Sequence, residues 1–142
     1  MILKLKSQFA PIIEHPIVQQ PSFRIGLSIA YTALLTLVLV QSSAHPLVGP
    51  VAPRDYNLAW EILLTAGHLI GFTLLVVLLY SALVTVTTPV RALIVAVIFA
   101  CSLGLLTEFI QSFVPDRSAS LFDLACDCGM AFVAAFWIRR RW

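Results

Sequence analysis

The chain has 142 residues, of which 60% are hydrophobic and 11% are charged, and its formal net charge is +2. Soluble domains have about 25% charged residues, and the mean hydropathy here is +0.96. This composition excludes an ordinary soluble enzyme, whose helices need polar outer faces, and a disordered chain, which needs low hydrophobicity and high charge. The small net charge gives no reason to expect nucleic acid as a partner. A small integral membrane protein remains.

Residues 1–22 form an arm of different composition, with prolines at positions 11, 16 and 21. Proline restricts its own backbone and that of the preceding residue, so we expect short extended pieces here. Such an arm is suited to lying along a partner protein. We therefore divide the chain into this arm, which we expect to be cytoplasmic, and a membrane domain over residues 23–142.

Four apolar stretches follow the arm, at about residues 25–41, 62–84, 90–113 and 121–138. At about 1.5 Å per helical residue, each approximates the hydrocarbon core of a bilayer, about 30 Å thick. Their apolar residues form unbroken runs and do not alternate with polar residues, as those of a half-buried strand would. An open sheet would also leave backbone groups unpaired in lipid. The sequence therefore predicts an all-α fold, a bundle of four transmembrane helices.

Two sequence signals mark helix starts within these stretches. Thr88 precedes Pro89, a pattern typical of an N-cap followed by proline at the first helical position. Ser120 is followed three residues later by Asp123, which resembles a capping box with Asp in place of the usual Glu or Gln. We expect helices to begin at both points.

The distribution of Lys and Arg predicts the orientation. If four spans alternate, one side of the membrane receives seven of these residues: Lys4, Lys6, Arg24, Arg91, Arg139, Arg140 and Arg141. The other side receives only Arg54 and Arg117. Cytoplasmic loops carry the excess of positive charge, so both termini are predicted to be cytoplasmic.

With this topology, the ionisable residues within or near the last three spans, except Arg91, fall in the outer third of the membrane together with Gln111. They are His68, Glu108, Gln111, Arg117, Asp123 and Asp127. Glu108 and Gln111 are three residues apart and Asp123 and Asp127 four apart, so each pair shares a helix face. A membrane-embedded charge costs about 2.5–3.5 kcal/mol at mid-bilayer, so such residues usually face the bundle interior and pair. We expect Arg117 to pair with Glu108 or Asp123, and His68 with another carboxylate.

Two interpretations of these six residues remain open. They form a ligand-binding pocket open to the outer leaflet, in which Arg117 pairs with a phosphate or carboxylate, or they form an internal network that fixes the helix register. His68 has a third interpretation as an axial ligand of a porphyrin or chlorin, because Gly67 and Gly71 permit close approach. Cys126 and Cys128 lie on nearly opposite helix faces, so no metal site is expected.

Several residues of the third and fourth spans form an ordered pattern: Glu108, Gln111, Pro115, Arg117 and Asp123. This pattern resembles the signature of the VanZ-like family of membrane proteins. His68 followed by Phe72 is similar to the family's upstream element. The resemblance covers about residues 60–137. Two positions depart from the family pattern, because Asp127 stands where Asn is common and Met130 where Gly is usual.

The resemblance implies a polytopic protein of the bacterial cytoplasmic membrane, in a family named for a link to resistance against glycopeptide antibiotics. The sequence contains no nucleophile elbow, no phosphate-binding glycine loop and no HExxH motif. A catalytic interpretation would have to use Glu108 and Asp127 as an acid–base pair around a lipid-linked substrate. We therefore expect a non-catalytic protein without a cofactor, which binds membrane lipids or a glycopeptide-type ligand. The alternative is a small accessory subunit of a larger membrane complex, for example a photosynthetic or respiratory one. It would be bound through the arm and the helix surfaces, with His68 near a pigment or haem.

Overall fold

A computed structural model describes residues 16–40, 58–114 and 119–141. All regular structure in these ranges is helical, and no strand occurs in them. The helices are α2 (Pro16–Gln19), α3 (Pro21–Leu39), α4 (Leu58–Leu83), α5 (Pro89–Gln111) and α6 (Leu121–Arg139).

Four helices of the described chain are long and apolar enough to cross a membrane. The spanning segments are Pro21–Leu39, Thr65–Leu83, Pro89–Gln111 and Leu121–Arg139. The predicted all-α fold with four transmembrane helices is therefore confirmed, and the chain is a multi-pass membrane protein. The predicted limits differ from the observed ones by a few residues at the helix ends, where α3 begins earlier and α5 ends earlier than expected.

Prolines begin three of the helices. Pro16, Pro21 and Pro89 are the first residues of α2, α3 and α5. The expectation of extended pieces is wrong for residues 16–19 and 21–22, because the first helical position tolerates proline, whose missing N–H has no intrahelical partner there anyway. Gln20, between the two helices, is extended. Thr88 is the N-cap of α5 as predicted, but its side chain makes no capping hydrogen bond. Its carbonyl oxygen accepts the bond from the Ala92 N–H instead.

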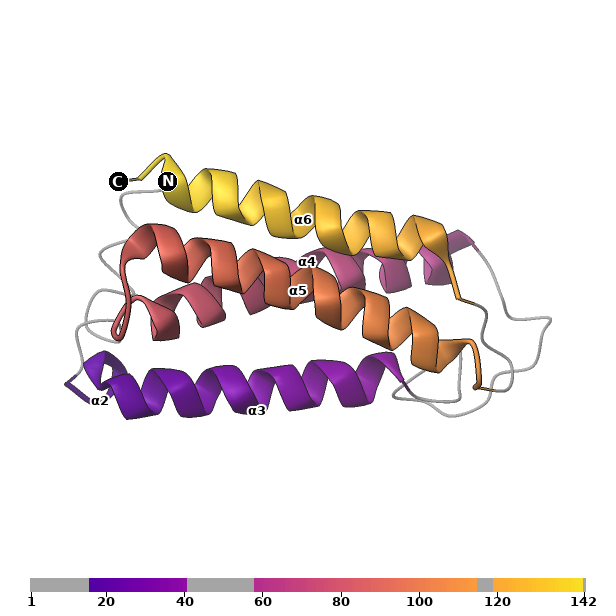
Figure 1. The fold of residues 1–142 in the computed structure, drawn as a ribbon. Coiled ribbons are helices and arrows are strands. Elements are labelled where there is room, and N and C mark those ends of the chain that lie inside the picture. The colour runs from indigo at the N-terminus through magenta and orange to yellow at the C-terminus, as the bar shows by residue number, and fades with distance from the viewer. Residues whose placement is uncertain (1–15, 41–57, 115–118, 142) are drawn as a thin grey trace.

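The long helices lie side by side and alternate in direction, with α3 and α6 on opposite sides of α4 and α5 (Figure 1). Helix α4 contacts α3, α5 and α6, whereas α3 makes little contact with α5. One end of the bundle therefore contains the end of α3, the start of α4, the end of α5 and the start of α6. Residues far apart in the sequence meet there.

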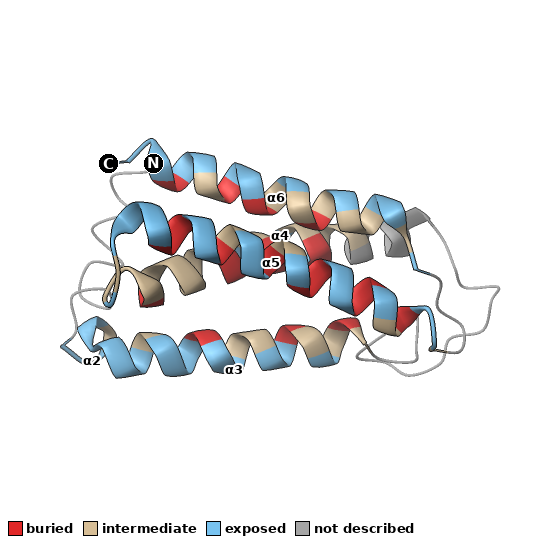
Figure 2. Ribbon diagram, in the orientation of Figure 1, coloured by how far each residue is buried: buried red, intermediate tan, exposed pale blue. Residues whose placement is uncertain are grey.

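The core is apolar and combines large residues of α4 with small residues of its neighbours. Phe72, Leu75 and Val76 of α4 are fully buried, and the alanines at positions 96 and 100 of α5 and 131 of α6 are equally inaccessible. The outward faces are also apolar: Figure 2 shows exposed residues along the outside of α3, α5 and α6, and Ile62, Ile70 and Leu74 of α4 are exposed as well. A soluble bundle would carry polar residues on those faces, so the surface is consistent with contact with lipid.

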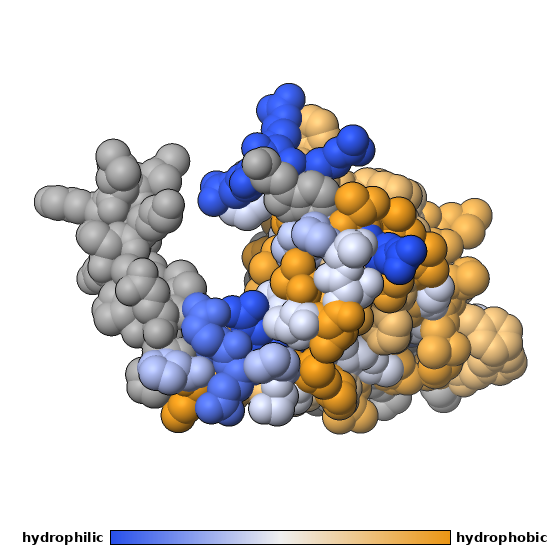
Figure 3. Space-filling view, turned by 60° about the vertical axis from the view of Figure 1, so that its left-hand side comes forward, coloured by the Kyte–Doolittle hydropathy of each residue, from blue (hydrophilic) through white to orange (hydrophobic). Residues whose placement is uncertain are grey.

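Basic side chains gather at the other end of the bundle, where α3 and α5 begin and α4 and α6 end. Arg24 lies in the first turn of α3, Arg91 in the first turn of α5, and Arg139–Arg141 at the end of α6. Figure 3 views this end, where the hydrophilic surface is concentrated, while the flanks are hydrophobic. The guanidinium of Arg141 lies 3.7 Å from the ring centroid of Trp137, and that of Arg140 lies 4.4 Å from the ring centroid of Phe136. We call this region the basic end.

Helix α3 is attached to α4 by polar contacts along an otherwise apolar interface. The Tyr31 hydroxyl donates to the carbonyl of Gly71 (3.0 Å), and the Ser28 hydroxyl lies 3.0 Å from the carbonyl oxygen of Leu78. A Cβ atom on Gly71 would lie 2.9 Å from Cδ1 of Leu35. A side chain at position 71 would therefore force the buried Leu35 side chain to move, and a large one would press on α3.

We predict that Gly71→Leu destabilises the bundle by about 1–3 kcal/mol, the usual cost of adding volume to a packed interface. Gly67→Leu is the matched control, because a Cβ atom on Gly67 would meet nothing within 4 Å. Both variants gain similar helix propensity, so this effect cancels in the comparison. Thermal unfolding in detergent micelles measures the difference, and equal midpoints for the two variants would contradict the packing argument.

Candidate functional site

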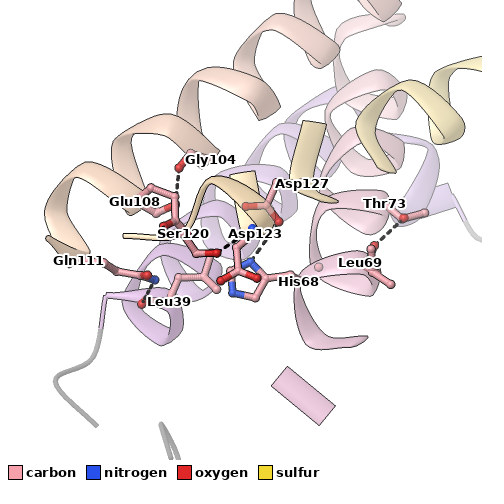
Figure 4. Close-up of polar contacts among 12 residues, drawn as sticks. Leu39, His68, Leu69, Thr73, Gly104, Glu108, Gln111, Ser120, Asp123 and Asp127 are labelled. Carbon is pink, nitrogen blue, oxygen red and sulfur yellow. Dashed lines mark hydrogen bonds and ion pairs between the residues drawn. The ribbon is translucent and has the colours of Figure 1, made fainter. Parts of the chain in front are cut away.

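Buried polar side chains from three helices gather at the end of the bundle opposite the basic end. His68 comes from α4, Glu108 and Gln111 come from the end of α5, and Asp127 comes from α6, and all four are buried. Asp123, in the first turn of α6, is partly buried beside them. Figure 4 shows these five side chains around the joint between the helices. We call this region the acidic end.

The central contact of the acidic end joins α4 to α6. Nδ1 of His68 lies 3.0 Å from Oδ1 of Asp127, within hydrogen-bond distance. Asp127 is 0% exposed, and its other oxygen, Oδ2, has no hydrogen-bond partner among the described residues. The predicted pairing of His68 with a carboxylate is confirmed. Gly104 of α5 provides the space, since a Cβ atom there would lie 3.3 Å from Cβ of Asp127.

A second set of contacts joins the end of α5 to the start of α6. The Ser120 hydroxyl accepts a hydrogen bond from the Asp123 backbone N–H (3.1 Å), so Ser120 is the N-cap of α6 as predicted. The Ser120 backbone N–H donates to Oε2 of Glu108 (2.6 Å). In a standard capping box, the backbone N–H of the N-cap residue donates to the side chain of the residue three positions later, which here is Asp123. Here Glu108, from the neighbouring helix, takes that place, and the shorter Asp123 does not.

Gln111 contacts the backbone of a third helix. Its Nε2 donates to the carbonyl oxygen of Leu39 at 2.7 Å. Leu39 is the last residue of α3, where carbonyl groups lack intrahelical donors. The Gln111 amide therefore satisfies a helix end with one of its two N–H groups.

A hollow of about 250 Å³ lies between the end of α5 and the start of α6. It is lined by Leu105, Glu108 and Phe109 of α5, the C-cap residue Ser112, and residues 119–121 and 124. Glu108 is 4% exposed, and its Oε1 has no hydrogen-bond partner in the described part of the chain. The hollow thus has one acidic side chain with an unused acceptor among mostly apolar walls.

The structure brings together five of the six predicted site residues: His68, Glu108, Gln111, Asp123 and Asp127. Arg117 and its predicted pairing with Glu108 or Asp123 lie outside the described residues. Sequence reasoning missed Gly104 and Thr107, whose hydroxyl donates to the Gly104 carbonyl at 2.9 Å. The sequence signal for Gly104 was its lack of a side chain one helical turn before Glu108, which permits another helix to approach closely on that face of α5.

Comparison of the chain with models of protein families, with curated proteins and with solved structures gives no match. The chemistry of the acidic end therefore follows from its own residues. Three carboxyl groups and one imidazole offer mainly hydrogen-bond acceptors. They suit a ligand that donates hydrogen bonds or carries positive charge.

We predict strong coupling between His68 and Asp127. His68→Leu or Asp127→Leu alone leaves the partner buried without its hydrogen bond, so each should destabilise the protein by about 3–5 kcal/mol. The double variant removes both polar groups, so it should lose about 0.5–3 kcal/mol less than the sum of the single variants. Unfolding in detergent micelles measures the four proteins, and strictly additive losses would show that the two side chains act independently.

Proposed function

We propose that the acidic end is an outward-facing polar pocket that binds an envelope lipid or a glycopeptide-type ligand without catalysing a reaction. The observation that carries this proposal is the side chain of Glu108. It is buried, one oxygen is bonded to Ser120, and the other has no partner among the described residues. An unsatisfied buried acceptor costs about 1–3 kcal/mol, and more when charged. A ligand that donates to Oε1 would remove that cost.

The location of the basic end supports the outward orientation. The described Arg residues are at the end of the bundle away from Glu108 and Asp127. Under the positive-inside rule, the basic end faces the cytoplasm and the pocket faces outward. The stacking of Arg141 on Trp137 also fits a membrane interface, where amphipathic aromatic rings concentrate.

We further propose that the chain is a VanZ-like protein of the bacterial cytoplasmic membrane, with a role in resistance to glycopeptide antibiotics. The support is the ordered pattern of Glu108, Gln111 and Asp123 in the sequence together with their contacts. Gln111 bonds the end of α3 and Glu108 bonds the start of α6, whereas Asp123 contributes its backbone N–H to the cap of α6. Asp127, which departs from the pattern, is used in the bond to His68.

A second candidate function is that of an accessory subunit in a larger membrane complex. An apolar groove of about 430 Å³ lies along α3, α4 and α5, lined among others by Ile29, Leu79 and Phe99. Its apolar lining suits a transmembrane helix of another protein. We do not extend this candidate to a pigment or haem at His68, because that imidazole is buried against Asp127 and offers little open surface. Co-purification with a larger complex in mild detergent would favour this function.

We predict that Arg117→Gln lowers the glycopeptide resistance of cells that express the chain and leaves its membrane level unchanged. The reason is that Arg117 belongs to the proposed pocket, where it would pair with an anionic group of the ligand. Arg91→Gln, the same substitution at the basic end, is the control and should keep the resistance. Antibiotic susceptibility and immunoblots of membranes measure both effects. Unchanged resistance would contradict the pocket, and loss of the protein itself would indicate a structural role.

We also predict the sidedness of the two ends. In a background with the three native cysteines replaced by alanine, Ala119→Cys should react with a membrane-impermeant maleimide in intact cells. Thr87→Cys, in the turn between α4 and α5, should react only after the cells are permeabilised. The opposite pattern would place the acidic end in the cytoplasm and contradict the orientation.

A further inference from the structure

We propose that the hollow beside Glu108 binds the ammonium group of a membrane lipid head group. This inference rests on the proposed function, because it names the ligand class of the same pocket. The ligand is an amphiphile whose positively charged amine contacts Glu108 while its acyl chains lie against the outside of α5 and α6.

The first argument is the geometry of the Glu108 carboxylate. Oε2 is fixed by the Ser120 backbone N–H at 2.6 Å, so the carboxylate cannot turn away to find another donor. Oε1 is buried and without a partner among the described residues, and Glu108 lines the hollow. A charge-assisted bond from an N–H⁺ donor is the strongest interaction available to such an oxygen.

The second argument is the charge around the hollow. Glu108, Asp123 and Asp127 lie close enough to act on one another and on His68 electrostatically. The Arg residues of the described chain are at the basic end. A phosphate or carboxylate placed in the hollow would meet carboxyl groups of like charge, whereas an ammonium group would be attracted.

The third argument is the size and lining of the hollow. Pockets for drug-sized ligands occupy about 300–1,000 Å³, so a hollow of about 250 Å³ suits a small group better than a whole glycopeptide. Phe109 lines it and packs edge-on against Phe113, with ring centroids 5.1 Å apart. An aromatic ring beside a carboxylate is a common environment for ammonium groups.

The surface around the hollow explains why the ligand is a lipid. Phe109 is 61% exposed and Leu121 is 85% exposed, and both line the hollow. They continue the apolar outer faces of α5 and α6, which spanning helices present to acyl chains. A lipid can therefore place its head group in the hollow without leaving the bilayer.

The test is native mass spectrometry of the full chain after exchange into nanodiscs. The discs contain equal amounts of phosphatidylethanolamine, phosphatidylcholine and phosphatidylglycerol, of which only the last lacks an ammonium group. We expect retained phosphatidylethanolamine to exceed phosphatidylglycerol about tenfold, the ratio expected from one charge-assisted hydrogen bond. Retention of phosphatidylcholine at a similar level would also support the proposal and would point to the Phe109 ring as the main contact.

Two variants make the test specific to the hollow. Glu108→Gln should bring the ratio of phosphatidylethanolamine to phosphatidylglycerol close to one. Ala119→Trp, which fills the hollow and leaves Glu108 in place, should also bring this ratio close to one. If Glu108→Gln does not fold, the ratio in Ala119→Trp tests the ammonium site. Val86→Trp, which adds the same bulky side chain at an exposed position of the turn between α4 and α5, is the matched control for Ala119→Trp and should keep the wild-type ratio.

The outcomes separate this inference from the proposed function. Equal retention of the three lipids by the wild type, or a preference that survives in both hollow variants, would overturn the ammonium site. If a lipid or an added glycopeptide is still retained and is lost in Arg117→Gln, the proposed pocket stands without the ammonium site. If the wild type retains neither a lipid nor a glycopeptide above the bulk composition, both proposals are overturned.

Discussion

A carboxyl group inside this bundle has to find its partners within the protein, because the outer faces of the helices are apolar. The contact between His68 and Asp127 meets this requirement across the interface of α4 and α6. It also fixes how the two helices are aligned, since a shift of either by one turn would leave a buried carboxyl group and a buried imidazole unpaired. The rest of the acidic end depends on this alignment, which sets the start of α6 beside the end of α5.

The joint between α3, α5 and α6 depends on side chains that bond backbone groups at helix ends. Glu108 bonds the N–H of Ser120, and Gln111 bonds the carbonyl of Leu39. Helix ends carry unsatisfied donors and acceptors, which are most costly where water is scarce. Polar residues near the ends of spans are therefore needed for folding whether or not they also bind a ligand.

The sequence was sufficient for the four spans and for parts of the site. Length and hydropathy predicted the helices, and local spacing predicted the cap at Ser120. The cost of buried charge predicted a carboxylate partner for His68. Sequence reasoning could not assign Gln111 to Leu39 or Glu108 to Ser120, because those partners are backbone groups that every residue carries. The helical start at Pro21 was missed because proline both interrupts and begins helices, and its position in the turn decides which.

The structural and the ligand-binding interpretations of the acidic end do not exclude each other. A carboxylate has two oxygens, and in both Glu108 and Asp127 one oxygen is used in a contact that joins helices. The second oxygen of each has no partner among the described residues. Asp127 Oδ2 lies against Gly104, inside the helix interface, whereas Glu108 borders a hollow at the surface. Of the two acids, Asp127 therefore serves mainly the fold, and Glu108 is the one to which a ligand can donate a hydrogen bond.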